Sequence, residues 1–275
     1  MKKKQSSRLT QQHRKSGGVA GIFGEEAQYH DKEVSSTSRV VLDILKAENP
    51  NLKFRYRKEI LKREINETLN RYDDYIGQTL FVENASIKPD GGIIEILDDN
   101  GNWRIVLVSE AKHQGKDIDN IRKGHLVGKN SDQDLMVAGN AIERAHKNIM
   151  EIANYMMFEP HFPYVLFLEG SNFLTHDVTV TRPDGRVVVL PYNAGSLNRL
   201  DRLTASNYGM PINTNLCIKK KISYNGMVRY LSAVSIFTQC DGEHWNDEDM
   251  IKIMLEIART SIYAIQDDLI NQIYE

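Results

Sequence analysis

Residues 93–112 contain two apolar runs separated by a signal for a tight turn. The first run is Ile93-Ile94-Glu95-Ile96-Leu97 and the second is Ile105-Val106-Leu107-Val108-Ser109, with Asp98-Asp99-Asn100-Gly101 between them. Asn-Gly favours the tight reversals that join antiparallel strands. The two runs therefore predict a β-hairpin, and this hairpin restricts where the polar residues at its ends can lie.

The polar residues at the two ends of this hairpin have the chemistry of a nuclease site. Lys88-Pro89-Asp90-Gly91-Gly92 precedes the first strand, and Glu110-Ala111-Lys112 follows the second. Alternation along a strand places Glu110 and Lys112 on one face and Ala111 on the other, and the hairpin can bring Asp90 near Glu110. Two carboxylates can hold a divalent cation, and a lysine can stand beside a scissile phosphate. The pattern predicts metal-dependent phosphodiester cleavage, with ordinary surface charges as the alternative.

Charge is distributed unevenly along the chain. The net charge is −2, but residues 1–24 contain six Lys or Arg and no acidic residue. Residues 241–275 carry nine acidic residues against Lys252 and Arg259, so the rest of the chain has a positive excess of five. We expect a flexible basic arm at residues 1–18 and a single α/β domain at 19–275. A polyanion partner would fit this distribution, because neutralised phosphates release counterions; a solvated terminus is the alternative.

Cysteine and histidine spacing favours neither a disulfide scaffold nor a structural zinc site. Cys217 and Cys240 are the two cysteines, and the eight histidines form no His-x-x-x-His pair. We expect most histidines to be polar surface or loop residues. No apolar stretch has the length of a membrane span, and the N-terminus lacks the apolar segment of a signal peptide. These features predict a soluble, cytoplasmic protein with no membrane partner.

Hydrophobic periodicity predicts an α/β fold, with a central mixed β-sheet flanked by helices and arm-like extensions. We expect helices over residues 19–48, 60–69, 138–157 and 245–274. We expect strands and turns over 80–112, a buried strand over 162–168, a hairpin over 178–190, and a strand pair formed by 216–222 and 230–237. The polar, glycine-containing segment 113–135 is expected to be a loop.

The start of the predicted helix near residue 138 suits contact with DNA bases. Small residues allow close approach of a backbone. Asn140 can pair with an adenine edge, Arg144 can pair with guanine, and Glu143 can accept from an exocyclic amine. The alternative is an ordinary first helical turn with a surface Glu-Arg pair.

Five segments together resemble the EcoRI-type type II restriction endonucleases, which belong to the PD-(D/E)xK class. They share long composite motifs in the same order: Lys88–Gly92, Glu110–Lys116, Asp132–Leu135, Ala138–Arg144 and Leu197–Leu203. The likeness is densest between Lys53 and Leu216 and fades after Gln239. It implies a restriction-endonuclease-like fold.

The resemblance also implies an activity, a cofactor and partners. It implies a homodimer that hydrolyses both strands of a palindromic duplex DNA site, GAATTC in the family, and leaves staggered ends. Mg²⁺ would be bound by Asp90 and Glu110 with the Ala111 carbonyl, and Lys112 would contact the scissile phosphate and the attacking water. Attack would be in line, without a covalent enzyme intermediate. A DNA methyltransferase is expected in the host, with no direct contact implied.

The resemblance assigns further residues to DNA contact. Residues that would read bases, or organise the groups that do, are Met136, Val137, Gly139, Asn140, Ala141, Glu143, Arg144 and Arg199. Residues carried over more weakly, as contacts to the DNA backbone or within the dimer, are Lys88, Lys116, Lys147, Asn148 and Arg202. Val137 departs from the family, which has a small Ala at that position.

Two alternatives to a restriction enzyme remain at this stage. One is a structure-specific repair nuclease of the same class, in which residues 140–144 would carry no sequence code. The other is a non-catalytic, sequence-specific DNA-binding protein on a nuclease scaffold. The presence of Asp90, Glu110 and Lys112 together argues against the second.

Overall fold

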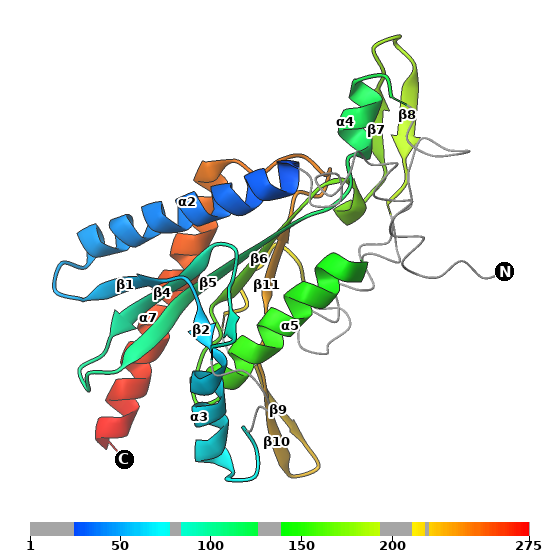
Figure 1. Ribbon diagram of the computed structural model, residues 1–275. Coiled ribbons are helices and arrows are strands. Elements are labelled where there is room, and N and C mark those ends of the chain that lie inside the picture. Colours follow the sequence, from blue (N-terminus) through cyan, green and yellow to red (C-terminus); the bar gives the residue numbers. More distant parts are fainter. Residues whose placement is uncertain (1–24, 78–83, 126–138, 193–210, 218–219, 275) are drawn as a thin grey trace.

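A central mixed sheet of five strands organises the protein (Figure 1). The computed structural model describes residues 25–77, 84–125, 139–192, 211–217 and 220–274. The sheet contains β1 (Phe54–Arg57), β4 (Gly92–Leu97), β5 (Trp103–His113), β6 (Tyr164–Glu169) and β11 (Ser235–Thr238), in the order β1-β4-β5-β6-β11. β1, β4 and β5 pair antiparallel, whereas β5, β6 and β11 pair parallel. The predicted α/β class with a mixed sheet is confirmed.

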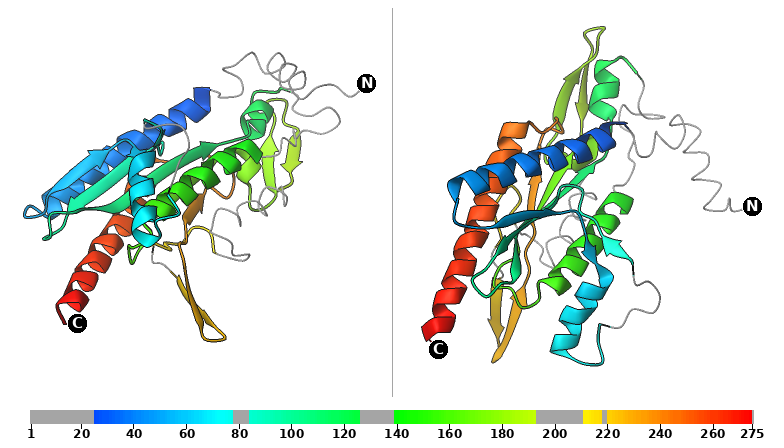
Figure 2. Two further views of the ribbon diagram at one scale, coloured as in Figure 1. Left: turned by 60° about the horizontal axis from the view of Figure 1, so that its bottom comes forward. Right: turned by 60° about the vertical axis from the view of Figure 1, so that its left-hand side comes forward.

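Helices cover both faces of this sheet (Figures 1 and 2). α2 (Glu25–Glu48) and α7 (Asp247–Tyr274) pack on one face, and α3 (Lys62–Tyr72) and α5 (Gly139–Tyr155) pack on the other. Within the described part of the chain, no helix is both long enough and apolar enough to cross a membrane. The expected basic arm lies outside the described residues.

The strand β6 supplies both halves of the core, because its side chains alternate between the two faces. Val165 and Phe167 pack with α2 and α7, whereas Tyr164, Leu166 and Leu168 pack with α3 and α5. All five are fully buried. A run without polar residues is therefore required here, as expected for a strand covered on both faces.

Three further strand pairs lie outside the central sheet. They are β2 (Ile60–Leu61) with β3 (Ser86–Ile87), β7 (Val178–Thr181) with β8 (Val187–Leu190), and β9 (Lys220–Tyr224) with β10 (Met227–Leu231). The β7-β8 and β9-β10 hairpins extend from opposite ends of the sheet (Figure 1). A short 3-10 helix, η2 (Ser171–Phe173), follows β6.

The predicted loop over residues 113–135 is wrong in part, because α4 (Asp117–Arg122) forms there. Ile118 and Ile121 are buried against Val180, Val188 and other apolar residues of the β7-β8 hairpin. Six residues are too few to show a clear helical period in the sequence. The helix therefore depends on a packing partner that follows it by about 60 residues in the chain.

The predicted pairing of residues 230–237 is also wrong in part. β10 pairs with β9 across the Asn225-Gly226 turn, but β11 leaves this hairpin and joins the central sheet beside β6. Periodicity could not separate the two strands, because apolar residues recur through both and no turn signal stands between them. The helix predicted at residue 60 begins two residues later, at Lys62, after the short strand β2.

Phe167 provides a test of this core. Its ring contacts Phe237, with ring centroids 6.2 Å apart, and Trp245, with centroids 5.2 Å apart. Phe167→Ala should lower the free energy of unfolding by about 3–5 kcal/mol through lost burial and a residual cavity. Urea unfolding followed by tryptophan fluorescence measures this change.

Val189→Ala is the matched control, because this β8 side chain is 58% exposed. It should change the free energy of unfolding by no more than about 0.5 kcal/mol. Equal effects of the two substitutions would contradict the described packing of β6.

Candidate active site

A tight turn before β4 places Asp90. The Gly92 N–H donates to the Pro89 carbonyl at 3.0 Å, and the Gly91 N–H donates to the Ser109 carbonyl at 2.9 Å. Gly92 has φ +78°, in the left-handed region that glycine occupies without strain. A Cβ on Gly91 would lie 2.2 Å from Ser109 Oγ, so a larger residue would push the turn away from β5. The two glycines thus hold Asp90 against the end of β5.

The strand β5 places Glu110 and Lys112 on the face that α5 covers. Ala111 packs in the opposite core with α2 and α7, as the predicted alternation requires. The Asp90 N–H lies 3.3 Å from Glu110 Oε2, so the predicted approach of Asp90 to Glu110 is confirmed. Glu110 is fully buried, and the side chains of Lys112 and Asp90 are 15% and 26% exposed.

Three oxygen atoms converge on the Lys112 ammonium. Its Nζ donates to Asp90 Oδ2 at 2.5 Å, to Glu110 Oε1 at 2.6 Å and to the Ala111 carbonyl at 2.7 Å. These are two carboxylates and one carbonyl, the oxygen ligands that hard divalent cations prefer. The structure therefore gathers a cation-binding set of oxygens around one point, with the ammonium at its centre.

The electrostatics of this cluster favour a proton or a cation among the carboxylates. Burial raises the pKa of Glu110 to about 7; the Asp90 carboxylate adds to this rise, and the Lys112 ammonium opposes it. Burial lowers the pKa of Lys112, but Glu110 and Asp90 outweigh this effect and raise it above its ordinary value. Lys112 therefore stays charged at neutral pH, where Glu110 titrates.

The structure adds side chains that the sequence pattern did not indicate. Burial and the Asp90 carboxylate raise the pKa of Asp31, on α2, to about 6. Burial raises the pKa of Tyr164, on β6, well above its ordinary value, with Glu110 and Asp90 contributing. No motif marks either residue, because Asp31 lies in a helix and Tyr164 in an apolar strand. Their proximity to the cluster arises from packing across the sheet.

The helix α5 reaches the cluster directly. The Asn148 side-chain amide donates to Glu110 Oε1 at 3.1 Å. On the same helix Ile142, Ala145 and Ile149 are buried against the sheet. These three buried side chains hold α5 against the sheet, and they thereby keep Asn148 within hydrogen-bonding distance of Glu110.

The residues predicted to contact DNA fall into three groups. Glu143, Arg144 and Lys147 are exposed on α5. For Gly139, Asn140 and Ala141 the structure describes only their backbone, in the first turn of α5. Residues outside the described part of the chain are Met136, Val137, Arg199 and Arg202.

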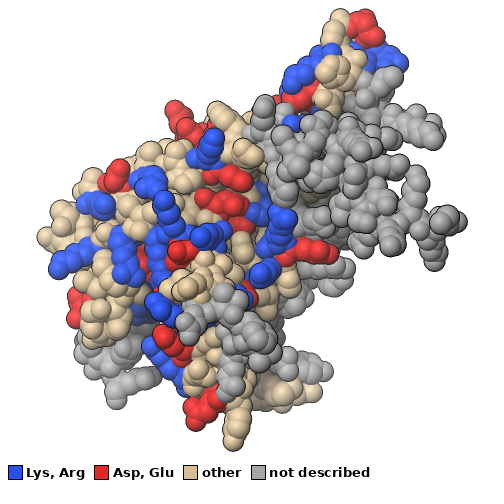
Figure 3. Space-filling model, viewed as in Figure 1, with Lys and Arg blue, Asp and Glu red and all other residues tan. Residues whose placement is uncertain are grey.

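The remaining predicted contacts are Lys88, two residues before Asp90, and Lys116, four residues after Lys112. Lys88 forms an exposed ion pair with Glu59, with 2.9 Å between Nζ and Oε2. Lys116 directly precedes α4. On the face shown in Figure 3, Lys and Arg side chains are interspersed with Asp and Glu. Charge alone therefore marks no DNA-binding surface on this face.

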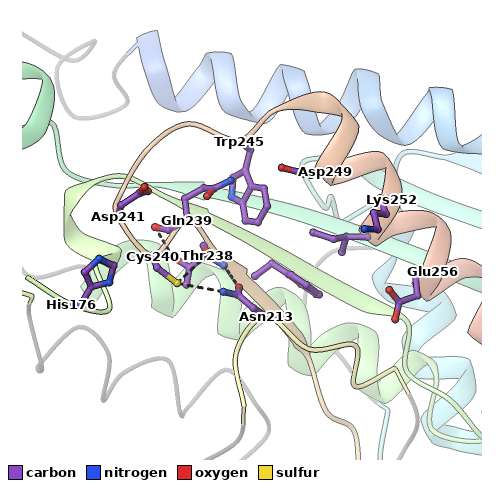
Figure 4. Close-up of a pocket in the computed structure, with 12 residues that line it drawn as sticks. His176, Asn213, Thr238, Gln239, Cys240, Asp241, Trp245, Asp249, Lys252 and Glu256 are labelled. Atoms are coloured by element: carbon purple, nitrogen blue, oxygen red, sulfur yellow. Dashed lines mark hydrogen bonds between the residues drawn. The ribbon is translucent and has the colours of Figure 1, made fainter. Parts of the chain in front are cut away.

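A large cavity lies elsewhere in the protein. It has a volume of about 550 Å³, and its lining includes Asn213, Thr238, Cys240 and Glu256, between the end of β11 and α7 (Figure 4). Asn213 accepts from the Thr238 N–H at 2.8 Å and donates to Cys240 Sγ at 3.5 Å. Asp90, Glu110 and Lys112, which together are called the Asp90 cluster below, do not line this cavity. The converging charged groups mark the candidate active site better than this cavity does, because cavity size reflects shape and not chemistry.

Comparison with known proteins finds two similar enzymes and one matching family. The family model described as restriction endonuclease EcoRI matches residues 16–272. The type II restriction enzyme EcoRI of Escherichia coli is 61% identical over 271 residues, which cover 98% of each chain. The type II restriction enzyme RsrI of Cereibacter sphaeroides is 48% identical over 267 residues, 97% of this chain and 96% of that enzyme. The family match extends into α7, as far as residue 272, beyond the region of densest likeness in the sequence motifs. The chain belongs to the EcoRI family of type II restriction endonucleases.

Proposed function

We propose that this restriction endonuclease hydrolyses both strands of GAATTC in duplex DNA, with Mg²⁺ as its cofactor, and leaves staggered ends. The observation that carries the mechanism is the convergence of Asp90, Glu110 and the Ala111 carbonyl on one cationic point. The choice of site and cofactor is supported by 61% identity to EcoRI.

The oxygen set fits the proposed cofactor. Mg²⁺ takes oxygen ligands and is commonly bound through one or two carboxylates with retained waters. Asp90 and Glu110 would hold it, with the Ala111 carbonyl as a third donor. When bound, Mg²⁺ would neutralise charge on the phosphoryl oxygens and lower the pKa of a coordinated water.

Lys112 has two roles in this proposal. Without the metal, its ammonium neutralises the two carboxylates by lying between them. With Asp90 and Glu110 holding a metal, the Lys112 ammonium would contact the scissile phosphate. There it would add positive charge where the pentacoordinate state gathers negative charge, a contribution of about 3 kcal/mol.

Recognition of the DNA sequence would come from α5 and the segments next to it. We assign base contacts to Met136, Val137, Gly139, Asn140, Ala141, Glu143, Arg144 and Arg199. Backbone or dimer contacts are assigned to Lys88, Lys116, Lys147, Asn148 and Arg202. Because Asn148 also donates to Glu110, a shift of α5 on DNA would change the hydrogen bonding of a metal-binding carboxylate. This contact offers a direct physical link between base reading and cleavage.

A short palindromic site calls for a two-fold symmetric enzyme. We propose a homodimer in which each chain places one Asp90-Glu110-Lys112 cluster at one strand. A host methyltransferase would protect the same site without contacting this chain.

A digest of mapped plasmid DNA tests the function. In Mg²⁺ we expect discrete fragments whose end sequences map to GAATTC with staggered cuts, and sedimentation should find two chains on one short duplex. Smearing or cutting only at junctions would instead indicate a repair nuclease. Tight binding without cleavage would indicate a DNA-binding protein. Cleavage of both strands by a monomer at the normal rate would contradict the dimer.

Lys112→Ala tests the role of the ammonium. The single-turnover cleavage rate should fall roughly 10²–10³-fold, because one preorganised charge is lost from the transition state. DNA binding should persist, and Mg²⁺ affinity should not fall, because a competing cation has been removed from the same oxygens. Rapid-quench cleavage and calorimetry measure these effects.

The matched control is Lys46→Ala, which removes an exposed lysine from the last turn of α2. Its cleavage rate should equal that of the unmodified chain. An unchanged single-turnover cleavage rate for Lys112→Ala would show that Lys112 takes no part in the cleavage step.

The raised pKa of Glu110 predicts a pH-dependent metal affinity. A carboxyl with a pKa of about 7 is protonated in a growing fraction of molecules as the pH falls from 8 to 6, and protons then compete with the metal. Mg²⁺ affinity should therefore fall as the pH is lowered, approaching about tenfold per pH unit below the pKa. Calorimetric titration across this range measures it. Glu110→Gln should abolish the pH dependence together with most of the affinity, whereas constant affinity in the unmodified chain would refute the proposed competition.

A further inference from the structure

Glu169 lies at the end of β6 among three histidines that are far apart in the sequence. His30 comes from α2, His113 from the end of β5, and His244 from the loop before α7. Glu169 is 1% exposed, and the His30 side chain is fully buried. The expectation that most histidines would be surface or loop residues is therefore wrong for His30, as it is for the buried His161.

The two oxygens of Glu169 have different environments. Oε2 accepts from the Trp245 N–H at 3.1 Å and lies 3.3 Å from His30 Nδ1. Oε1 lies 2.9 Å from His113 Nδ1 and 2.8 Å from His244 Nδ1. One oxygen thus fixes the carboxylate in place, while the other faces two imidazole nitrogens.

The spacing of these atoms is compatible with a bound metal ion. His113, Glu169 and His244 each offer a ligand atom, and the three atoms lie within 4.8 Å of one another. A tetrahedral ion with bonds of about 2.0–2.2 Å holds its ligand atoms about 3.3 Å apart. The atoms therefore need to move only by small side-chain rotations. The rings of His113 and His244 lie nearly parallel to each other, with an interplanar angle of 12°.

A small cavity adjoins these ligands. His113, His244 and Asp119 are among its lining residues, and its volume is about 10 Å³, close to the space that one water molecule needs. Asp119 Oδ2 lies 3.9 Å from His244 Nε2, so a second carboxylate faces the same ring. The cavity therefore leaves room for one water beside the two imidazoles.

We propose that His113, Glu169 and His244 form a binding site for a borderline divalent transition-metal ion such as Zn²⁺ or Co²⁺. Two imidazoles and one carboxylate select such ions over Mg²⁺, which prefers oxygen ligands alone. The Trp245 N–H, which donates to Oε2, is the outer partner that orients the ligating carboxylate.

The proposed site is separate from the Asp90 cluster, although one strand carries both. His113 follows Lys112 on β5 and, by alternation, belongs to the opposite face, where Ala111 packs with α2 and α7. An ion there would connect the ends of β5 and β6 to the loop that leads into α7. The separation of the two sites allows their metals to be distinguished by substitution.

Cobalt titration of the full chain tests this proposal. Co²⁺ reports its ligands by visible absorption, so the intact chain should bind one Co²⁺ with an imidazole-type spectrum that excess Mg²⁺ does not remove. Asp90→Asn should retain this spectrum, because it alters only the other site. His244→Ala should weaken the binding at least tenfold.

Two further variants make the result decisive. His176→Ala removes an exposed histidine outside the cluster and should bind Co²⁺ as the unmodified chain does. His244→Cys offers a thiolate at the same position, and it should restore binding with a new near-ultraviolet sulfur-to-cobalt absorption. His244 is 48% exposed, so its replacement should leave the fold intact, which circular dichroism checks.

Three outcomes would overturn the proposal. The first is no saturable Co²⁺ binding, which would mean that the cluster only fastens the start of α7 through hydrogen bonds. The second is binding that His244→Ala leaves unchanged. The third is loss of the spectrum in Asp90→Asn or in excess Mg²⁺, which would place the ion at the catalytic carboxylates.

Discussion

The contact between the Lys112 ammonium and the buried Glu110 carboxylate is the constraint on which the site depends. A fully buried carboxylate is costly unless a cation or hydrogen-bond donors compensate it. Here Lys112 supplies the charge and the Asn148 amide supplies a further hydrogen bond. The protein thereby keeps two carboxylates close together, at a point where a divalent metal can replace the ammonium. The same arrangement explains how the folded protein keeps the Asp90 and Glu110 carboxylates in place next to each other.

The strand β5 places side chains in two chemically different environments, one on each face of the central sheet. Along β5, Glu110 and Lys112 belong to the α5 face, whereas Ala111 and His113 belong to the α2 and α7 face. The first face offers oxygen donors and a lysine. The second brings His113 to Glu169 and His244. Because strand alternation separates neighbouring side chains, residues adjacent in sequence can take part in two distinct sites.

The packing of α5 connects recognition with chemistry. Its buried stripe fixes the helix against the sheet, its exposed Glu143 and Arg144 are proposed to read bases, and Asn148 touches Glu110. Because α5 contacts Glu110 directly, a small displacement of this helix would reach the carboxylate that we propose to bind the metal. The Gly91-Gly92 turn fixes the other carboxylate of the cluster. Its close contact with Ser109 leaves Asp90 little freedom to move.

The sequence by itself determined the local features of this protein. The apolar runs and Asn100-Gly101 specified the β4-β5 hairpin, and strand alternation put Glu110 and Lys112 on one face, because these properties depend on neighbouring residues. Composite motifs identified the family for the same reason. Tertiary structure alone decided the short helix α4, the departure of β11 to the central sheet, the approach of Asp31 and Tyr164 to the cluster, and the grouping of His113, Glu169 and His244. Each of these depends on packing between segments far apart in the chain, and no local periodicity or spacing records such contacts.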